Sequence, residues 1–184
     1  MTREDALNLL NQHIHADNLK KHCLATEAIM RELARHFGED EEAWAVAGLL
    51  HDLDFEETRD DPASHGKRTL ELLDGTDLSE EVRRAIARHN AEALGLTRET
   101  RLDFALTCAE TITGLIVAAA LVHPDKKIAS VKVKSIRKRM KSKDFARNVN
   151  RDHIALCEEI GLPLNDFIEM SLRAMTAIGD RLGL

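Results

Sequence analysis

Aromatic residues are scarce in this 184-residue chain, which has five Phe, one Trp and no Tyr, 3% in all. Stacked aromatic side chains are the usual means of reading single-stranded nucleic acid. Strands of β-sandwiches also favour aromatic and β-branched residues. The composition therefore predicts neither specific recognition of nucleic acid nor a β-sandwich.

Proline and cysteine are rare as well. Only three Pro interrupt a chain rich in Ala, Leu, Glu, Lys and Arg, residues that favour helices. The three cysteines, Cys23, Cys108 and Cys157, are scattered and form no CxxC pair. An odd, scattered set is typical of a reduced protein. We expect small buried thiols and a cytoplasmic location.

Long apolar runs are absent too. The most apolar stretch, residues 112–122, is too short to span a membrane. The first residues carry charges at Arg3, Glu4 and Asp5, which is not the pattern of a signal peptide. We therefore expect no membrane partner. A homodimer through residues 112–122 stays open, although core packing explains that run more simply.

Charge is present but unevenly distributed. The net charge is −6, yet residues 126–147 hold ten Lys or Arg and a single acid, Asp144. Such a run is usually a solvated face. Among its cations, Lys134 is our first choice for a side chain that holds a substrate phosphate.

Apolar residues recur at helical spacing, and no stretch shows sustained alternation of period two. We therefore predict an all-α protein in which residues 1–184 form one helical domain. It would have a metal-site core at about 18–122 and a helical extension at about 123–184. The expected helices cover residues 3–14, 18–37 with Asp17 or Asn18 as the cap, 41–51, 62 or 64 to 73, 80–89, 97 or 100 to 122, part of 131–143, 150–156 and 163–178. An acidic turn is expected at 54–64.

One stretch carries the strongest chemical signal. An apolar helical run from Trp44 to Leu50 is followed at once by His51 and Asp52. Neighbouring helix positions point about 100° apart, and a helix end can relax that angle. One imidazole and one carboxylate can therefore close on a single metal ion.

Further candidate ligands lie on both sides of this doublet: His22 upstream, and His65, His89 and Glu110 downstream. Glu110 interrupts the apolar middle of a helix, where a carboxylate must be paired or bound to a cation. Helical bundles build metal sites from such inward carboxylates and imidazoles. A lone histidine is more often structural, so we expect structural or surface roles for the other five, His13, His15, His36, His123 and His153.

Taken in order, these residues resemble the HD-domain family of metal-dependent phosphohydrolases. The resemblance covers roughly the first two-thirds of the chain, and the tail around residues 133–135 and Asn150 is similar to small bacterial single-domain members. It is carried by His22, Ala47-Gly48-Leu49-Leu50-His51-Asp52, His65-Gly66, His89-Asn90, Ala109-Glu110 and Thr113-Gly114.

The resemblance implies one or two divalent metal ions. The first would be held by His22, His51, Asp52 and Glu110, and Asp52 would bridge to a second ion completed by His65 and His89. If only one metal binds, His65 and His89 become substrate contacts or proton-transfer groups. Nitrogen and oxygen ligands suit Fe, Mn, Zn, Co or Ni without choosing among them.

The same resemblance implies residue roles. Asp52, His65 and His89 would be catalytic, Asn90 and Lys134 would bind substrate, and Asp54 would orient a ligand histidine. One departure is that the family has Asp where this chain has Glu110, which could retune the metal or weaken the enzyme.

The implied function is hydrolysis of a small phosphomonoester, nucleotide or phosphodiester by metal-activated water. The alternative is a catalytically weakened HD module that binds a metal or nucleotide and acts through a partner. The complete set of histidines favours the enzyme, and Glu110 is the one feature that favours the alternative.

Overall fold

The computed structural model describes all of residues 1–184 and contains helices but no strand, so the all-α prediction is confirmed. Two short 3-10 turns, Ile128–Ser130 and Leu156–Ile160, join the later helices. The α-helices are α1 (Arg3–His13), α2 (Asp17–Phe37), α3 (Glu41–Leu50), α4 (Phe55–Thr58), α5 (Lys67–Leu72), α6 (Glu80–His89), α7 (Ala91–Leu94), α8 (Arg101–Leu121), α9 (Val133–Met140), α10 (Arg151–Ala155), α11 (Leu164–Ala177) and α12 (Gly179–Leu182).

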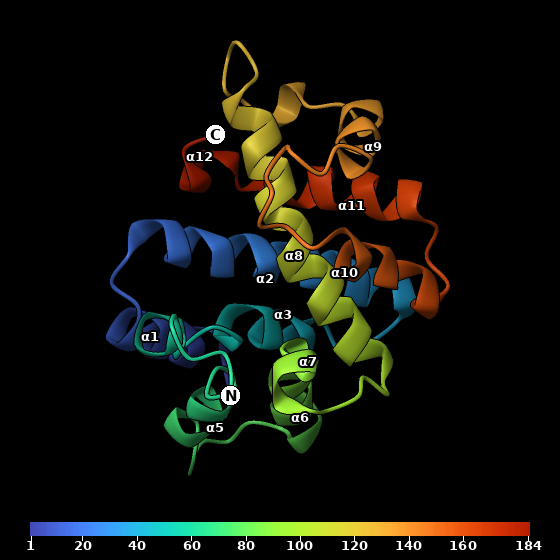
Figure 1. The fold of residues 1–184 in the computed structure, drawn as a ribbon. Helices are drawn as coiled ribbons and strands as arrows, with labels where there is room; N and C mark the ends of the chain where they lie inside the picture. Colours follow the sequence, from blue (N-terminus) through green and yellow to red (C-terminus); the bar gives the residue numbers. More distant parts are fainter.

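The long helix α8 runs through the middle of the molecule and crosses α2 (Figure 1). Helices α2 and α3 form a closely packed hairpin beside it, with α5, α6 and α7 at one end of the molecule and α9, α11 and α12 at the other. The buried apolar side chains form one continuous cluster from Ala6 on α1 to Leu182 on α12. The C-terminal extension is therefore packed on the same core as the first two-thirds of the chain.

Several helix ends lie where local residues predict them. Gly38 ends α2 in the left-handed conformation, with φ of 70°. The Ser79 hydroxyl caps α6, and Thr100 forms a reciprocal capping box with Asp103 at the start of α8. These ends follow from neighbours within three residues, which is why sequence patterns locate them.

The start of α2 is different, and the expected cap at Asp17 or Asn18 is wrong. The N-cap residue is Ala16, which has no side chain able to accept a hydrogen bond. The carboxylate of Glu56 replaces it by accepting from the backbone N–H groups of His15 at 3.0 Å and Ala16 at 2.6 Å. An acid forty residues away thus satisfies donors that a local cap would otherwise serve.

The helix expected to carry His65 begins later than predicted. Helix α5 starts at Lys67, after Gly66 with φ of 89°, so His65 lies in the preceding turn. The Asp54 carboxylate accepts from the backbone N–H groups of Gly66 at 2.7 Å and Thr69 at 3.0 Å. Asp54 therefore caps α5 from a distance and leaves His65 free to point away from the helix.

Gly48 sets the spacing between α2 and α3. A Cβ atom at this position would lie 2.9 Å from the backbone nitrogen of Glu27 and 3.0 Å from the carbonyl oxygen of Thr26. The two helices therefore pack backbone against backbone, which only glycine permits. This close approach brings the residues at the end of α3 next to His22 on α2.

Helix α8 is long and apolar enough to cross a membrane by length and composition, but 67% of its most apolar window is buried inside the fold. Ile112 and Ile116 are fully buried. This is the pattern of a core helix. Exposed large apolar side chains occur only at its end, where Leu121 is 51% exposed and the following Val122 59%.

Candidate metal centre

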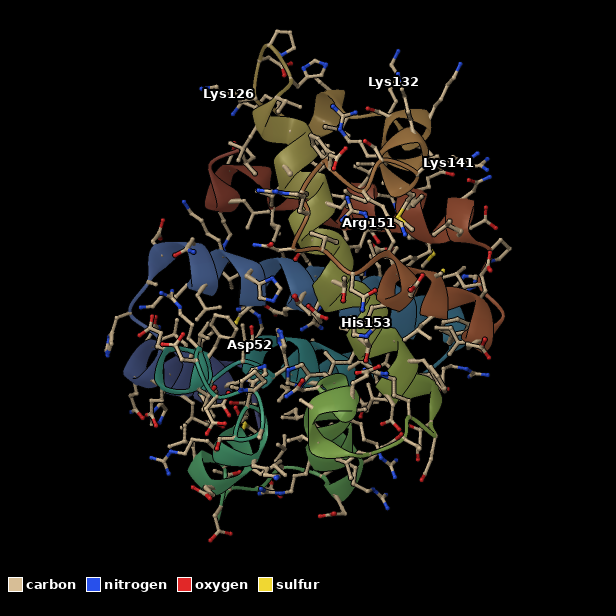
Figure 2. The ribbon with its side chains drawn as sticks, in the orientation of Figure 1. Asp52, Lys126, Lys132, Lys141, Arg151 and His153 are labelled. Atoms are coloured by element: carbon tan, nitrogen blue, oxygen red, sulfur yellow. The ribbon has the colours of Figure 1, made fainter.

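Four imidazoles and one carboxylate converge where α2, the end of α3, the turn before α5 and the end of α6 meet. Figure 2 shows Asp52 in the space below α2. Two groups of three side chains bring their ligand atoms within 4.8 Å of one another, and Asp52 belongs to both: His22, His51 and Asp52, and Asp52, His65 and His89.

All four histidines direct Nε2 at this common point. The Asp52 carboxylate lies 3.5 Å from Nε2 of His22, 3.4 Å from that of His51, 3.3 Å from that of His65 and 3.5 Å from that of His89. The Nε2 atoms of His22 and His51 are 3.1 Å apart, and those of His65 and His89 are 2.9 Å apart. Asp52 is therefore the centre of the cluster.

The other ring nitrogen of each histidine is held by a group that accepts a hydrogen bond. Nδ1 of His51 lies 2.9 Å from the carbonyl oxygen of Gly48, and Nδ1 of His89 contacts the carbonyl oxygen of Ile86. A carbonyl oxygen can only accept, so each Nδ1 carries the proton and donates it. Both Nε2 atoms are then lone-pair donors to a ligand.

In His65 and His22, the group that accepts from Nδ1 is a side chain. Nδ1 of His65 donates to the Asp54 carboxylate at 2.8 Å, which confirms the predicted orienting contact. Nδ1 of His22 lies 2.9 Å from the hydroxyl of Thr113, whose own proton goes to the carbonyl oxygen of Glu110 at 2.6 Å. The hydroxyl therefore accepts from His22, and its Nε2 also presents a lone pair.

When all four rings are neutral, four Nε2 lone pairs and a carboxylate thus face one another with no hydrogen-bond donor among them. Such an arrangement is unfavourable unless a cation lies between them. A divalent metal ion meets this need, and partners on Nδ1 are what metal-bound histidines typically have. The residues present therefore fit one or two ions of the nitrogen- and oxygen-preferring metals.

The pKa values of these groups also indicate that the cluster requires a positive charge. Burial lowers the pKa of His51 to about 3, so this ring is neutral. Burial alone would lower the pKa of His65 too, but hydrogen bonds and attraction from Asp52 and Asp54 raise it to about 10. Burial opposes ionisation of Asp52, yet the surrounding imidazoles hold its pKa well below the usual range. Without metal, a proton on His65 supplies the positive charge that the cluster requires.

Glu110 lies near the cluster but outside both groups of mutually close ligand atoms. It lines a cavity of about 280 Å³ beside His22, and its carboxylate accepts from the hydroxyl of Thr111. Burial raises the pKa of this carboxyl group. The structure therefore places Glu110 next to the cluster without bringing it into either ligand group.

Asn90 holds the turn that carries His65. Its side-chain amide donates to the carbonyl oxygens of Pro62 at 2.8 Å and His65 at 3.1 Å. Both amide protons are thereby used inside the protein. The structure gives Asn90 a positioning role and offers no support for the expected contact with substrate.

Lys134 is not brought to the cluster. It lies exposed on α9 and lines a separate cavity of about 380 Å³ whose walls include none of the five clustered residues. Ala119, near the C-terminal end of α8, is the residue of this helix that lines the cavity. A role for Lys134 in holding phosphate at the metal centre therefore has no structural support.

Sequence reasoning assigned no supporting role to two residues that hold the site, although Thr113 was among those that carry the family resemblance. Thr113 orients His22, and Arg98 donates to the carbonyl oxygen of His89 at 2.9 Å while pairing with Glu92. Thr113 follows Glu110 by three residues and so shares its helix face, which was a usable signal. Nothing in the sequence marks Arg98, because it acts from a loop.

Comparison with known families adds the final observation. The family model described as HD domain matches residues 19–121, more than half of the chain. The matched span contains all five clustered residues and Glu110.

This chain belongs to the HD-domain family.

HD-domain proteins are typically metal-dependent hydrolases, and the clustered His and Asp side chains here fit metal binding. No curated protein and no solved structure matches the chain. The resemblance inferred from the sequence is thus confirmed at the level of the family. Residues 1–18 and 122–184 lie outside the matched span.

Proposed function

We propose that this HD-domain protein is a phosphohydrolase that cleaves a small phosphomonoester, nucleotide or phosphodiester with metal-activated water. The observation that carries the proposal is the convergence of four Nε2 atoms on Asp52, all four Nδ1 atoms being held by other groups. With neutral rings these five groups are all acceptors, an arrangement that a buried cluster tolerates only with a cation or an added proton among them.

His22, His51 and Asp52 would hold one divalent ion, and Asp52, His65 and His89 a second, so that Asp52 bridges them. We propose Glu110 as a further ligand of the first ion because it lies in the cavity beside His22. Ions bound there lower the pKa of water and neutralise charge on a phosphate group. If a single ion binds, His65 and His89 instead contact substrate or move a proton.

The cluster opens to solvent mainly at His22. The His22 side chain is 23% exposed, whereas that of His51 is 1% and that of His89 5% exposed. Substrate would therefore approach from the side of His22 and α8. Buried thiols and the buried core helix α8 support the further proposal of a cytoplasmic protein that acts on a small molecule.

The test is the metal content of protein purified without a metal-binding tag, measured by inductively coupled plasma mass spectrometry, together with a panel of phosphate esters assayed with Mn²⁺. We expect about two ions per chain and turnover of at least one ester, lost on chelation and restored by metal. A chain that stays metal-free after reconstitution would overturn the proposal.

The second candidate function is a metal-binding module without catalytic activity that acts through a partner. The position of Glu110 outside both ligand groups is the observation that favours it. Stoichiometric metal binding without turnover of any ester in the panel would support this function over the enzyme.

A further inference from the structure

The cavity beside His22 has two walls of different origin. One wall is α8, with Glu110, Thr113 and Gly114, inside the span that matches the HD domain. The other wall is formed by residues 148–150 and His153, which come after that span. The extension of this chain therefore forms one wall of the space next to the metal centre.

The wall contributed by the extension is a fixed loop. The Arg151 guanidinium donates to the carbonyl oxygens of Ala146 at 2.7 Å and Val149 at 2.5 Å, and also to those of Ser142 and Phe145. Figure 2 shows Arg151 beside α8, where this loop passes. One side chain thus gathers four carbonyl groups and holds residues 142–149 in place.

Gly114 lets this loop lie directly on α8. A Cβ atom at Gly114 would be 3.1 Å from Cγ2 of Val149, so a larger residue would push the loop away. The preceding residue is Thr113, which orients His22. The loop is therefore packed one residue from the hydrogen bond that fixes a member of the metal cluster.

Two polar side chains of this wall have groups left for a ligand. Nε2 of His153 lies 3.2 Å from the Glu92 carboxylate, whose pKa the Arg98 hydrogen bond lowers to about 2. An ionised carboxylate only accepts, so Nε2 donates, and Nδ1 of a neutral His153 is free to accept. The Asn148 amide makes no hydrogen bond within the protein, whereas Asn150 is used to cap α10.

The cavity also has a clear charge preference. No Lys or Arg lines it, and Glu110 is the one side chain in its walls with a formal charge when the histidines are neutral. A second phosphate would meet no counter-charge here. An acceptor at His153 and an amide at Asn148, which both donates and accepts, are instead suited to hydroxyl groups.

We propose that the substrate's leaving group is an uncharged, hydroxyl-bearing group such as a sugar or polyol, bound by Asn148 and His153. This inference rests on the proposed function, because the metal centre next to the cavity would hold the phosphate. It assigns a substrate contact to His153, which sequence reasoning placed at the surface or among structural residues. The C-terminal extension then determines specificity while the HD-domain core performs the reaction.

Binding of non-hydrolysable ligands to the Mn²⁺-loaded protein tests the inference without requiring turnover. We compare methylphosphonate with the phosphonate analogue of ribose 5-phosphate by isothermal titration calorimetry. The sugar phosphonate should bind about tenfold more tightly in the wild type, as expected for one or two added hydrogen bonds. In Asn148→Ala and His153→Gln this preference should fall to about threefold or less, with methylphosphonate affinity unchanged.

Matched controls lie outside the cavity. Asn8→Ala and His36→Gln change exposed side chains of the same two types and should keep the full preference. Metal content and thermal unfolding show that each variant is folded and loaded. Equal affinity of the wild type for both ligands, or a preference that persists in both cavity variants, would overturn the inference.

The outcome separates this inference from the proposed function. A wild type that prefers the sugar phosphonate but hydrolyses no phosphate ester would disprove the enzyme and keep the binding site. A wild type that hydrolyses p-nitrophenyl phosphate but shows no preference for the sugar phosphonate would keep the enzyme and disprove the site. A second phosphonate on the sugar should not tighten binding, because no cation lines the cavity.

Discussion

The metal centre and the basic segment at residues 126–147 are opposite in how their charges are arranged. In the centre, each histidine has a partner on Nδ1 and turns Nε2 to Asp52. In the basic segment, ten Lys or Arg accompany one acid, and none of these cations makes an ion pair. Figure 2 shows Lys126, Lys132 and Lys141 at the outer edge of the molecule.

The two regions also differ in what each leaves unsatisfied. The centre is buried and brings together acceptors that need a cation or a proton, whereas the basic segment is mostly exposed and has cations without a carboxylate partner. Unsatisfied acceptors are costly in a buried place, but exposed cations are solvated by water and screened by salt. The comparison teaches that a surplus of charge indicates a binding site only where solvent cannot compensate it.

The largest expected effect comes from removing the shared ligand. Asp52→Ala should abolish binding of both metals and lower turnover by about a thousandfold or more, since Asp52 belongs to both groups. His65→Ala should keep about one ion per chain. Metal analysis and kinetics of the two variants provide the measurement.

Lys134→Ala is the matching change in the basic segment. It should keep full metal content and nearly wild-type turnover, because Lys134 lines a separate cavity. A large loss of turnover in this variant, or full metal retention in Asp52→Ala, would contradict the contrast between the two regions.

The next largest effect on metal affinity is expected from residues that orient the metal ligands. Asp54→Asn removes the carboxylate that accepts from His65 and from two backbone N–H groups. We expect metal affinity to fall about 10- to 100-fold, as for other partners of metal-bound histidines. Competition with a chelating dye measures this. Asp125→Asn, an acid that holds the start of the basic segment through Lys127 and Ser130, should leave metal affinity unchanged.

Gly48→Ala should destabilise the protein by about 1–3 kcal/mol, because its methyl group would collide with the backbone of α2. Metal affinity should fall as well, since His51 and Asp52 would shift away from His22. Urea unfolding and metal titration measure both effects. Gly75→Ala, where no atom lies nearby but φ is 71°, should lose some stability and keep its metal affinity.

The pH dependence of the metal-free protein should show the coupling within the centre. The folded pKa of His65 is raised to about 10 from 6.5, so its stabilisation is complete below pH 6.5 and is lost as pH rises through 10. The folded pKa of His51 is lowered to about 3, so its neutral burial favours the folded state above 6.5 and costs stability as pH falls below that value.

Ring signals of the two histidines, followed by NMR titration with chelator present, measure these states. At pH 8 His65 should be protonated, and at pH 5 His51 should be neutral. The reverse assignment would mean that the carboxylates do not control the cluster. Urea unfolding across the same range should give a stability that declines at both extremes.

The smallest effect is expected in the basic segment. The triple variant Lys132→Gln, Lys134→Gln, Lys138→Gln should be as stable as the wild type or more stable by about 0.5 kcal/mol, because it relieves repulsion between like charges. The difference should shrink at high salt. A clear loss of stability on urea unfolding would show that these lysines make contacts that the structure does not contain.

Local patterns in the sequence located many features of this protein. The caps at Ser79 and Thr100 and the end at Gly38 follow from residues a few positions apart. The His51-Asp52 doublet and its companions were chosen by residue type and helix position, and the structure brings His22, His65 and His89 to them. Such signals succeed because helix geometry is set by neighbours within one turn.

Other features depend on residues far apart, and these the sequence did not reveal. Asp54 and Glu56 act as caps for helices they do not belong to, Asn90 holds a turn, and Lys134 lies on another part of the surface. These contacts and positions depend on which groups become neighbours when α2, α3 and α8 pack together. The spacing of a motif carries no information about that adjacency.

The sequence by itself therefore determined the helical class, the family and the residues able to bind metal, because these depend on residue type and short-range periodicity. Only the tertiary structure decided the direction of each imidazole, the shared position of Asp52 and the placing of His153 beside the centre. The physical reason is that hydrogen-bond partners such as His22 and Thr113 are 91 residues apart and meet only when α2 packs on α8.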